Sequence, residues 1–522
     1  MQLTKYLLVG GAGLALLAGA QTPPAAPAPV ASTTPAAPPA PTGAAAASPT
    51  RVLTLEETVK LALEHNLDIQ IQRLALPVDR FQIGVTEGAY DPVFKFTANA
   101  NYSATPSSGF IQGTTIPLNP NIVSTTSYTP DISGTLQSGL TYDISGPLSD
   151  STSPTGTIPG YAHYNTSPGI TLRQPLLKNL WIDNPRYQIL LNKYQLRVDE
   201  AGLRLQIMTT VNNTKAAFFN LIYARDNVQV KDLALKLAQQ LLTENRKKVE
   251  VGSLAPLDEK QAQSQAASAK ADLIAAEQAL VAQENVLIGL ITDKFSEWSG
   301  VRPVPAESLV AVPPELNLQD SLRDGIAKRP DYLQAKLQVE SQNITVRYTR
   351  NQVFPELDIT GSYGRRATDP GFESAINDVT AGNTPYYSAG VFVSIPLGNR
   401  AASNNYKAAK ETVKQLLAKM KKSELGIVIA IDNDVKTVRS DYERVQATRE
   451  ASAYAKDALD AEQKKLENGK STSFVVLQLQ SNLTSAKSAE LRALADFNIA
   501  VQQLAFDDGT LLERSHIGVS VK

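Results

Sequence analysis

Few side chains in this sequence have the types and the spacing that enzymatic or metal chemistry requires. The three histidines, His65, His163 and His516, are far apart in the chain and form no metal-ligand cluster. The sequence contains no cysteine, which excludes thiol chemistry, disulfides and acylation of an N-terminal cysteine. We find no catalytic constellation, so the sequence predicts a protein that is not an enzyme and that needs no cofactor and no metal.

Two short motifs resemble parts of known ligand sites without completing them. Asp432, Asn433 and Asp434 follow the start of a calcium loop, but the glycine and the glutamate of that loop are missing. They lie inside a heptad run, so we interpret them as a solvated patch. Residues 10–13, Gly-Gly-Ala-Gly, lie inside an N-terminal signal sequence and form no phosphate-binding loop.

The charge balance and the N-terminal segment indicate an exported protein without a nucleic-acid partner. Fifty basic and 51 acidic residues give a net charge of −1. Lys5, the apolar run Leu7–Leu17 and the small residues Ala18–Ala20 predict a signal peptide over residues 1–20. The alternative is an N-terminal membrane anchor. Residues 21–50 are rich in Ala, Pro and Thr and predict a disordered linker.

No later segment has about 18 consecutive apolar residues, so the sequence predicts no membrane-spanning helix. Two destinations then remain for an exported chain. One is the periplasm or the exterior, and the other is the outer membrane, entered as a β-barrel.

The mature chain repeats itself. Leu55, Asp68 and Pro92 of the first half align with Leu318, Asp331 and Pro355 of the second. Pro175 aligns with Pro396, and Gly252 with Gly469. We therefore divide the chain into a first repeat at 51–300, a linker at 301–314, a second repeat at 315–510 and a tail at 511–522.

Each repeat predicts the same order of elements, which is a broken helix, two strands, a very long helix, a tight turn and a further helix. The broken helices cover Leu55–His65 with Leu67–Gly88, and Leu318–Lys328 with Pro330–Gln352. The long helices run from about Pro185 to Glu250 and from about Ala401 to Glu467, each roughly 100 Å.

The apolar residues of both long helices repeat in steps of three and four, which predicts coiled-coil packing. The alternative is a single soluble antiparallel bundle, which leaves the strands unexplained. The two stripes are Val211, Thr214, Phe218, Leu221, Arg225 and Val228, and Val428, Ile431, Val435, Val438, Tyr442 and Val445.

The predicted strands have one apolar and one polar face. Such strands fit either a half-buried soluble sheet or a membrane barrel with lipid outside and water inside. The signal peptide and the 100 Å helices favour the barrel. We expect the lipid-facing residues to include Phe94, Phe96, Tyr102, Leu357, Ile359 and Tyr363.

An insertion at 105–161 separates the two strands of the first repeat. It is rich in Ser, Thr, Gly and Pro, so we expect much of it to be a surface loop. Within residues 130–146, Ile132 and Gly134 alternate with polar residues, as do Tyr142 and Ile144 after a turn. This pattern predicts a hairpin that either widens the barrel or folds over its mouth.

In this order of elements the chain resembles the TolC family of outer-membrane efflux proteins, from about Leu53 to Gly509. The strand pairs are followed by Gln174-Pro175-Leu176 and by Ile395-Pro396-Leu397. The resemblance implies an α+β membrane protein in the cell outer membrane and a homotrimer. Each protomer would give about four strands to a shared 12-stranded barrel, and its helices would form a coiled-coil tunnel into the periplasm.

The turns between the long helices match the periplasmic tips of that family. The resemblance implies that they contact a periplasmic adaptor (membrane fusion) protein, which couples the duct to an inner-membrane pump of the RND or ABC type. The alternative is that they are plain turns without a partner. The tip residues are Val251, Gly252, Ser253, Leu254, Leu257 and Asp258, with Asn468, Gly469, Lys470, Ser471, Ser473 and Phe474.

The chain departs from the family at the periplasmic aperture. Well-known members narrow it with a ring of aspartates after the second tip, whereas the matching positions here are Val475 and Gln478. Asp258 after the first tip is retained. We therefore expect a looser or apolar constriction.

The sequence thus predicts a passive exit duct for efflux or type I secretion. Because no catalytic group is found, the energy for transport must come from a partner. The alternative, from another class, is a secreted coiled-coil structural or adhesive protein without a pore. A periplasmic hydrolase is a third and remote reading.

Overall fold

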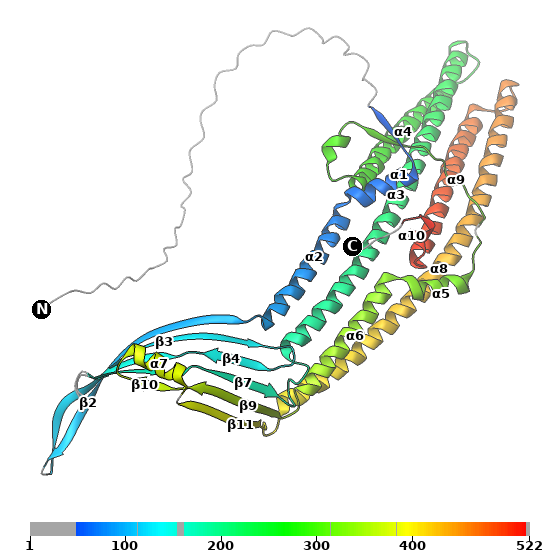
Figure 1. The fold of residues 1–522 in the computed structure, drawn as a ribbon. Coiled ribbons are helices and arrows are strands. Elements are labelled where there is room, and N and C mark those ends of the chain that lie inside the picture. The colour runs from blue at the N-terminus through cyan, green and yellow to red at the C-terminus, as the bar shows by residue number, and fades with distance from the viewer. Residues whose placement is uncertain (1–48, 112, 154–160, 314, 383, 518–522) are drawn as a thin grey trace, which may run out of the picture. The chain divides into compact units, whose positions relative to one another are not determined.

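The computed structural model describes residues 49–111, 113–153, 161–313, 315–382 and 384–517 (Figure 1). The predicted signal peptide and nearly all of the predicted linker lie outside these residues. The described chain combines long helices with one large sheet, and the predicted α+β class is confirmed.

The broken helix that opens each repeat is present at the predicted positions, because capping residues fix its ends. Thr54 and Glu57 form a capping box before the first helix. Asn66 ends that helix and caps the next by accepting hydrogen bonds from the amides of Asp68 and Ile69. The helices are α1 (Leu55–His65), α2 (Leu67–Glu87), α5 (Leu318–Lys328) and α6 (Pro330–Asn351).

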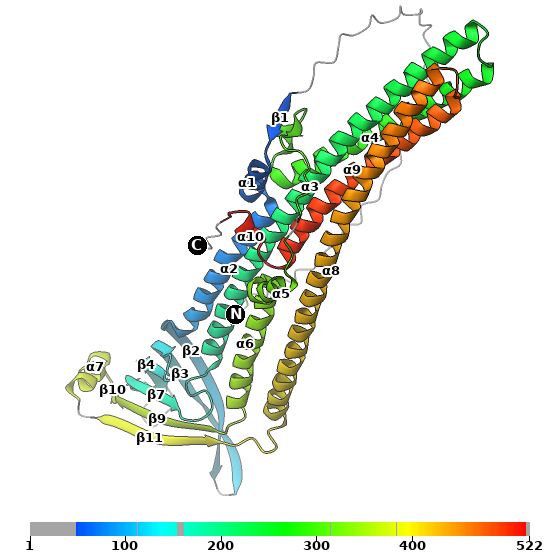
Figure 2. The ribbon, with the colours of Figure 1, turned by 90° about the vertical axis from the view of Figure 1, so that its right-hand side faces the viewer.

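Four long helices carry the coiled coil, and two of them, α3 and α8, begin within a residue of the predicted starts and end at the predicted residues. At 1.5 Å per residue, α3 with its 67 residues spans about 100 Å. Near the sheet, α2, α3, α6 and α8 lie side by side and form one helical layer (Figure 2). Farther from the sheet, α3 and α8 continue and pack with α4 and α9 instead. The long helices are α3 (Asn184–Glu250), α4 (Pro256–Ile291), α8 (Arg400–Glu467) and α9 (Ser473–Asp507), followed by the short α10 (Leu511–Arg514).

The predicted heptad stripes form the cores between these helices. On α8, Ile431, Val438 and Val445 are fully buried against α9. On α3, Phe218 and Leu221 are fully buried against α1 and α4. One position differs, because Ile427 and not Val428 enters the core. The coiled-coil prediction is confirmed.

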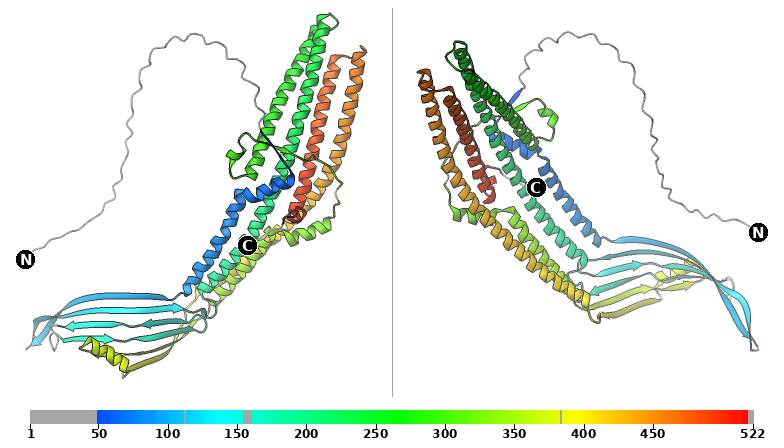
Figure 3. Two further views of the ribbon diagram at one scale, coloured as in Figure 1. Left: turned by 45° about the horizontal axis from the view of Figure 1, so that its top comes forward. Right: turned by 180° about the vertical axis from the view of Figure 1, so that it is seen from behind.

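The sheet contains nine strands and holds both repeats together (Figure 3). The order is β10-β6-β5-β3-β4-β7-β9-β11, with β2 paired to β3 at one edge. All pairs are antiparallel. The strands are β2 (Val93–Ile111), β3 (Thr114–Thr135), β4 (Thr141–Ser145), β5 (Leu148–Ser153), β6 (Tyr161–Thr166), β7 (Gly169–Pro175), β9 (Glu356–Arg365), β10 (Ala367–Asp369) and β11 (Pro385–Ser394).

The four predicted strands correspond to β2, β7, β9 and β11, and the predicted hairpin is present as β3 and β4. Its turn is closed by hydrogen bonds from the Leu136 amide to the Leu140 carbonyl and from the Gly139 amide to the Leu136 carbonyl. The hairpin lies within the sheet, between β2 and β7. The expectation that much of 105–161 is a loop is wrong for the described part, because β3, β5 and β6 pair with their neighbours along this segment.

Several small elements were not predicted. A parallel pair of β1 (Thr50–Leu53) and β8 (Arg302–Pro305) lies partly in the segments read as linkers. The helix α7 (Phe372–Ala381) lies between β10 and β11, and two short 3₁₀ helices cover Gly88–Tyr90 (η1) and Phe295–Trp298 (η2).

By length and composition alone, α4 could cross a membrane, which the criterion of consecutive apolar residues did not find. Its most apolar 18-residue window has a mean hydropathy of 1.3. Near its end, Leu287, Ile288 and Ile291 pack in the core with Phe218 of α3, and nearer its start Ala266 and Ala269 pack against Ala238 of α3. We therefore interpret α4 as one arm of the hairpin that it forms with α3.

Candidate functional site: the sheet faces and the helical tips

One face of the sheet is apolar across six strands. Residues directly opposite each other in an antiparallel pair lie on the same face. The register therefore defines a single row that crosses β2, β3, β4, β7, β9 and β11. This row is Phe94, Ile132, Ile144, Ile170, Tyr363 and Tyr387.

The predicted lipid-facing residues belong to this face. Phe94, Phe96 and Tyr102 of β2 are 59–69% exposed in the single chain. Ile359 and Tyr363 of β9 are also exposed, and Leu357 is half-buried. A band of large apolar side chains without a protein cover suits contact with lipid.

The opposite face is largely polar, with the exposed Val93 of β2 and Phe392 of β11 as apolar exceptions. In the next row, Ser133, Asp143, Thr171, Ser362 and Ser388 lie opposite one another, and the last two share a hydrogen bond of 2.7 Å. Near the helices, Arg173 binds the buried Asp358 and also Glu356, at 2.5 and 2.8 Å. This face can therefore contact water.

The first tip joins α3 to α4 through a glycine-dependent turn. Gly252 has a φ of +73°, which side-chain-bearing residues rarely adopt. The Ser253 amide donates to the Lys248 carbonyl at 2.8 Å, and the Gly252 amide donates to the Val249 carbonyl. These bonds satisfy the last carbonyls of α3 in the manner of a Schellman motif.

The second tip repeats this geometry between α8 and α9. Gly469 has a φ of +71°, and the Lys470 amide donates to the Lys465 carbonyl at 2.8 Å. Ser471 adds a side-chain hydrogen bond of 2.6 Å to Glu462, which also binds Lys465. The aligned sequences of the two repeats therefore fold into matching turns.

A buried asparagine connects the two tips, and the sequence analysis missed it. Asn245 of α3 is fully buried and accepts a hydrogen bond of 2.9 Å from the Ser473 hydroxyl of α9. Its amide nitrogen also lies 3.5 Å from the Asp258 carbonyl of α4. An asparagine inside a coiled coil typically fixes register, but only the fold shows which partners it meets.

Only some of the residues predicted to contact an adaptor are exposed at the tips. Val251, Leu257 and Phe474 are 58–78% exposed, and Gly252 and Gly469 have open space around them. Ser473 differs, because its side chain is buried against Asn245. Ser473 therefore contributes a buried hydrogen bond between α9 and α3 and is not part of the exposed surface.

The positions aligned with the family aperture lie on the first turns of α9. Val475 is 38% exposed, and the exposed Gln478 donates to Asn482 at 3.1 Å. Asp258 of α4 is partly exposed. Across the described residues, no group of three or more acidic or histidine side chains could hold a metal ion.

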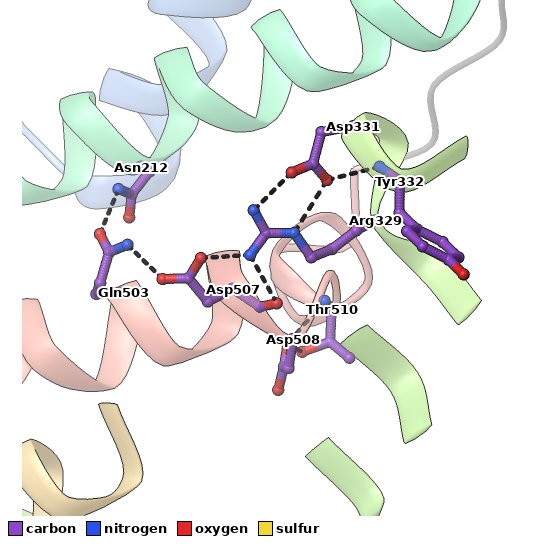
Figure 4. A network of polar contacts seen from close by, with 8 residues as sticks. All are labelled: Asn212, Arg329, Asp331, Tyr332, Gln503, Asp507, Asp508 and Thr510. Carbon is purple, nitrogen blue, oxygen red and sulfur yellow. Dashed lines mark hydrogen bonds and ion pairs between the residues drawn. The ribbon is translucent and has the colours of Figure 1, made fainter. Parts of the chain in front are cut away.

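A polar network fixes the place where α6 begins against the end of α9 (Figure 4). The Arg329 guanidinium binds Asp507 at 2.6 Å and Asp331 at 2.8 Å. Gln503 extends the network from Asp507 to Asn212 of α3. Burial and the neighbouring Asp507 raise the pKa of Asp434, on α8, to about 7.

A sheet with one apolar and one polar face, joined to long coiled-coil helices, defines the fold of TolC-type outer-membrane channels. The chain matches the family described as "Outer membrane efflux protein" over residues 58–292 and 322–510, and it belongs to this family. The predicted resemblance and the outer-membrane location are confirmed. The members of the family are channel proteins.

The relatives are distant but span most of the chain. The outer membrane efflux protein BepC of Brucella suis biovar 1 (strain 1330) is 22% identical over 72% of this chain and 76% of its own. The CmeC outer membrane channel of Campylobacter jejuni superposes with a TM-score of 0.64 at 15% identity, over 88% of this chain and 86% of its own. The outer membrane protein VceC of Vibrio cholerae superposes with a TM-score of 0.63 at 16% identity, over 87% of this chain and 96% of its own.

We predict that Asn245→Leu loosens the tips. The substitution keeps the branched shape of the side chain but leaves the buried Ser473 hydroxyl without its partner, which costs about 1–3 kcal/mol. Hydrogen exchange of the amides at both tips should accelerate. Asn482→Leu is the matched control, because Asn482 is exposed and bonds only along α9. Equal exchange in the two variants would contradict the bridging role of Asn245.

We also predict a pH dependence that arises from Asp434. Its pKa of about 7 lies above the unfolded value of 3.8, so the folded protein holds this proton more tightly. Stability from this group is complete below about pH 4 and is lost progressively as the pH rises to about 7. Between pH 5 and pH 7, the unfolding temperature should therefore fall less in Asp434→Asn than in the wild type. Asp432→Asn, at an exposed ion pair with Lys436, should keep the wild-type slope.

Proposed function

We propose that this protein is the outer-membrane exit duct of a tripartite efflux or type I secretion system. It passively conducts substrates from the periplasm to the exterior, and its helical part projects into the periplasm. The observation that carries the proposal is the sheet with one apolar and one polar face, whose strands continue directly into coiled-coil helices. Lipid covers the apolar face, and the polar face lines the duct.

Surfaces that one chain leaves uncovered support assembly into a homotrimer. On α2, Ile71, Leu74, Val78, Phe81 and Val85 repeat in steps of three and four, and all are 64–74% exposed. Such a stripe is a coiled-coil seam without its partner. Since α2 and α8 lie at opposite ends of the helical layer, α2 of one copy packs against α8 of the next.

On α8, Leu417, Leu425 and Ile429 are 43–59% exposed and supply the apolar surface that this contact needs. The same neighbours join β2 of one copy to β11 of the next. A soluble coiled-coil protein without a pore is disfavoured, because it would leave both the stripe and the lipid-facing band in water.

The tips are the docking surface for the periplasmic adaptor. Two matching turns place exposed apolar side chains, Val251 and Leu257 on one and Phe474 on the other, at the free ends of the helices. Exposed apolar side chains, beside glycines with open space around them, suit the insertion of a helical hairpin from a partner. The adaptor then couples the duct to an inner-membrane pump of the RND or ABC type, which supplies the energy.

At the aperture, Val475 and Gln478 replace the aspartates of well-known family members. A valine and an amide side chain bind cations far more weakly than a ring of carboxylates. We therefore propose a constriction that is looser or apolar, with Asp258 as its remaining acidic residue.

Conduction by the purified trimer tests the proposal. We expect wild-type trimers to produce discrete conductance steps in planar bilayers. Phe81→Glu places a charge in the α2 seam and should abolish both the trimer on native gels and the conductance. Arg80→Glu, on the neighbouring exposed position, should keep both. A wild-type trimer that never conducts, or a monomer free of the membrane, would refute the duct.

Charged substitutions at the tips test the docking surface. Gly252→Glu and Gly469→Glu should weaken binding of the cognate adaptor at least about tenfold, which corresponds to about 1.4 kcal/mol, while trimers still form. Gly300→Glu is the matched control, because Gly300 has a φ of +81° and open space but lies far along the chain from either tip. If all three variants bind the adaptor like the wild type, the tips are plain turns.

A further inference from the structure

We propose that the closed barrel of this protein contains eighteen strands, because the β3–β4 hairpin is a permanent part of its wall. The inference rests on the proposed trimeric duct and changes its architecture. The resemblance alone implies four strands per protomer and twelve in all.

The hydrogen-bond register places the hairpin inside the sheet. The β3 strand pairs with β2 over almost its whole length, from Val93 opposite Ser133 to Ile111 opposite Thr114. On the other side of the hairpin, β4 pairs with β7, from Thr141 opposite Arg173 to Ser145 opposite Gly169. No pairing between β2 and β7 is present in the described chain. The hairpin therefore separates these two strands.

The side chains of the hairpin match both faces of the wall. Ile132 and Ile144 continue the apolar row between Phe94 and Ile170. Asp143 and Ser133 continue the polar row toward Thr171. A loop folded over the mouth needs no such alternation, whereas a strand between lipid and water requires it.

The nine strands of the sheet form six rows across the wall, because β5, β6 and β10 continue β4, β7 and β9 along the same ladders. This number of rows is compatible with closure. Antiparallel pairing along β2, β3, β4, β7, β9 and β11 makes β11 run opposite to β2, since the count is even. The free edge of β11 can therefore pair in antiparallel fashion with the free edge of β2 in the next copy. Three copies then close a ring without an exposed edge, as the membrane requires.

The widths of the two layers also agree. Six strands about 4.8 Å apart and tilted by about 40° cover an arc of about 38 Å, whereas four would cover about 25 Å. The four adjoining helices, α2, α3, α6 and α8, cover about 32–40 Å at interaxial distances of 8–10 Å. Three such arcs give a barrel about 36 Å across, against about 24 Å for twelve strands.

Thiol cross-linking can count the strands, because the chain has no native cysteine. Asp143→Cys with Thr171→Cys pairs β4 with β7, and a short bis-maleimide, which adds one maleimide to each thiol, should link the two within one chain in native membranes. Val93→Cys with Thr171→Cys is the competing pair. In the six-stranded sheet these positions lie in one row, three strand spacings or about 14 Å apart, and should not react.

A third set of variants reports on the trimer itself. Ser388→Cys on β11, combined in turn with cysteine at Lys95, Thr97, Asn99 or Asn101 on β2, should yield a covalent trimer at one register. Trimers in which Val93 and Thr171 react while Asp143 and Thr171 do not would overturn the eighteen strands and leave the duct intact. Failure to find any trimer would refute the duct instead.

Direct imaging of the unmodified protein decides the matter if a cysteine variant misfolds. A cryo-electron microscopy map of the wild-type trimer in lipid nanodiscs should show eighteen strands in cross-section. A cross-section with twelve strands, and the hairpin outside the wall, would overturn the inference.

Discussion

The structure depends on one requirement, which is that every backbone N–H and C=O group of a sheet in lipid has a hydrogen-bond partner. In one chain the edges formed by β2 and β11 lack a partner among the described strands. Water cannot fill this role inside a bilayer, where each unsatisfied group costs several kcal/mol. The sheet alone therefore demands copies of itself, before any helix contact is considered.

The helices also need further copies of the chain, in their case to cover exposed apolar surface. The cores along α3 and α8 bury their heptad residues within one chain, but the stripe on α2 from Ile71 to Val85 stays exposed. The outermost strand β2 follows α2, and β11 leads into α8 (Figure 2). The uncovered strand edges and the outer helices thus lie on the same two flanks of the protomer. One neighbour can satisfy both, so the barrel and the tunnel assemble through a single contact.

Elements with strong local signals were predictable from the sequence. The helix breaks at Asn66 and Pro330 and the glycine turns at both tips depend on capping and on φ, which neighbouring residues decide. The hairpin around Ser138 was predictable because its flanks alternate.

The missed elements lack such a local signal. The strands β5 and β6 are rich in Ser, Thr and Tyr without a clean apolar face, so they resembled a loop until β3 paired with them. The contact of Asn245 with Ser473 joins residues 228 positions apart, and no sequence pattern near either residue indicates it. In α4, polar residues such as Glu277, Gln278 and Glu284 interrupt the apolar ones, so a search for consecutive apolar residues does not find the helix although its mean hydropathy is high.

The junction between sheet and helices shows how a wall of strands continues as a wall of helices. Asn351, at the end of α6, accepts from the Asn179 amide and donates to the Leu177 carbonyl, while Asn399 donates to the Val353 carbonyl. Asn179 and Asn399 both have positive φ, a conformation that asparagine tolerates better than most residues. These asparagines satisfy backbone groups where strand pairing stops before helix pairing begins. The hairpin turn at Gly139 packs against Pro175 and the Asn179 carbonyl at this same level, so the added strands end on the junction that supports the others.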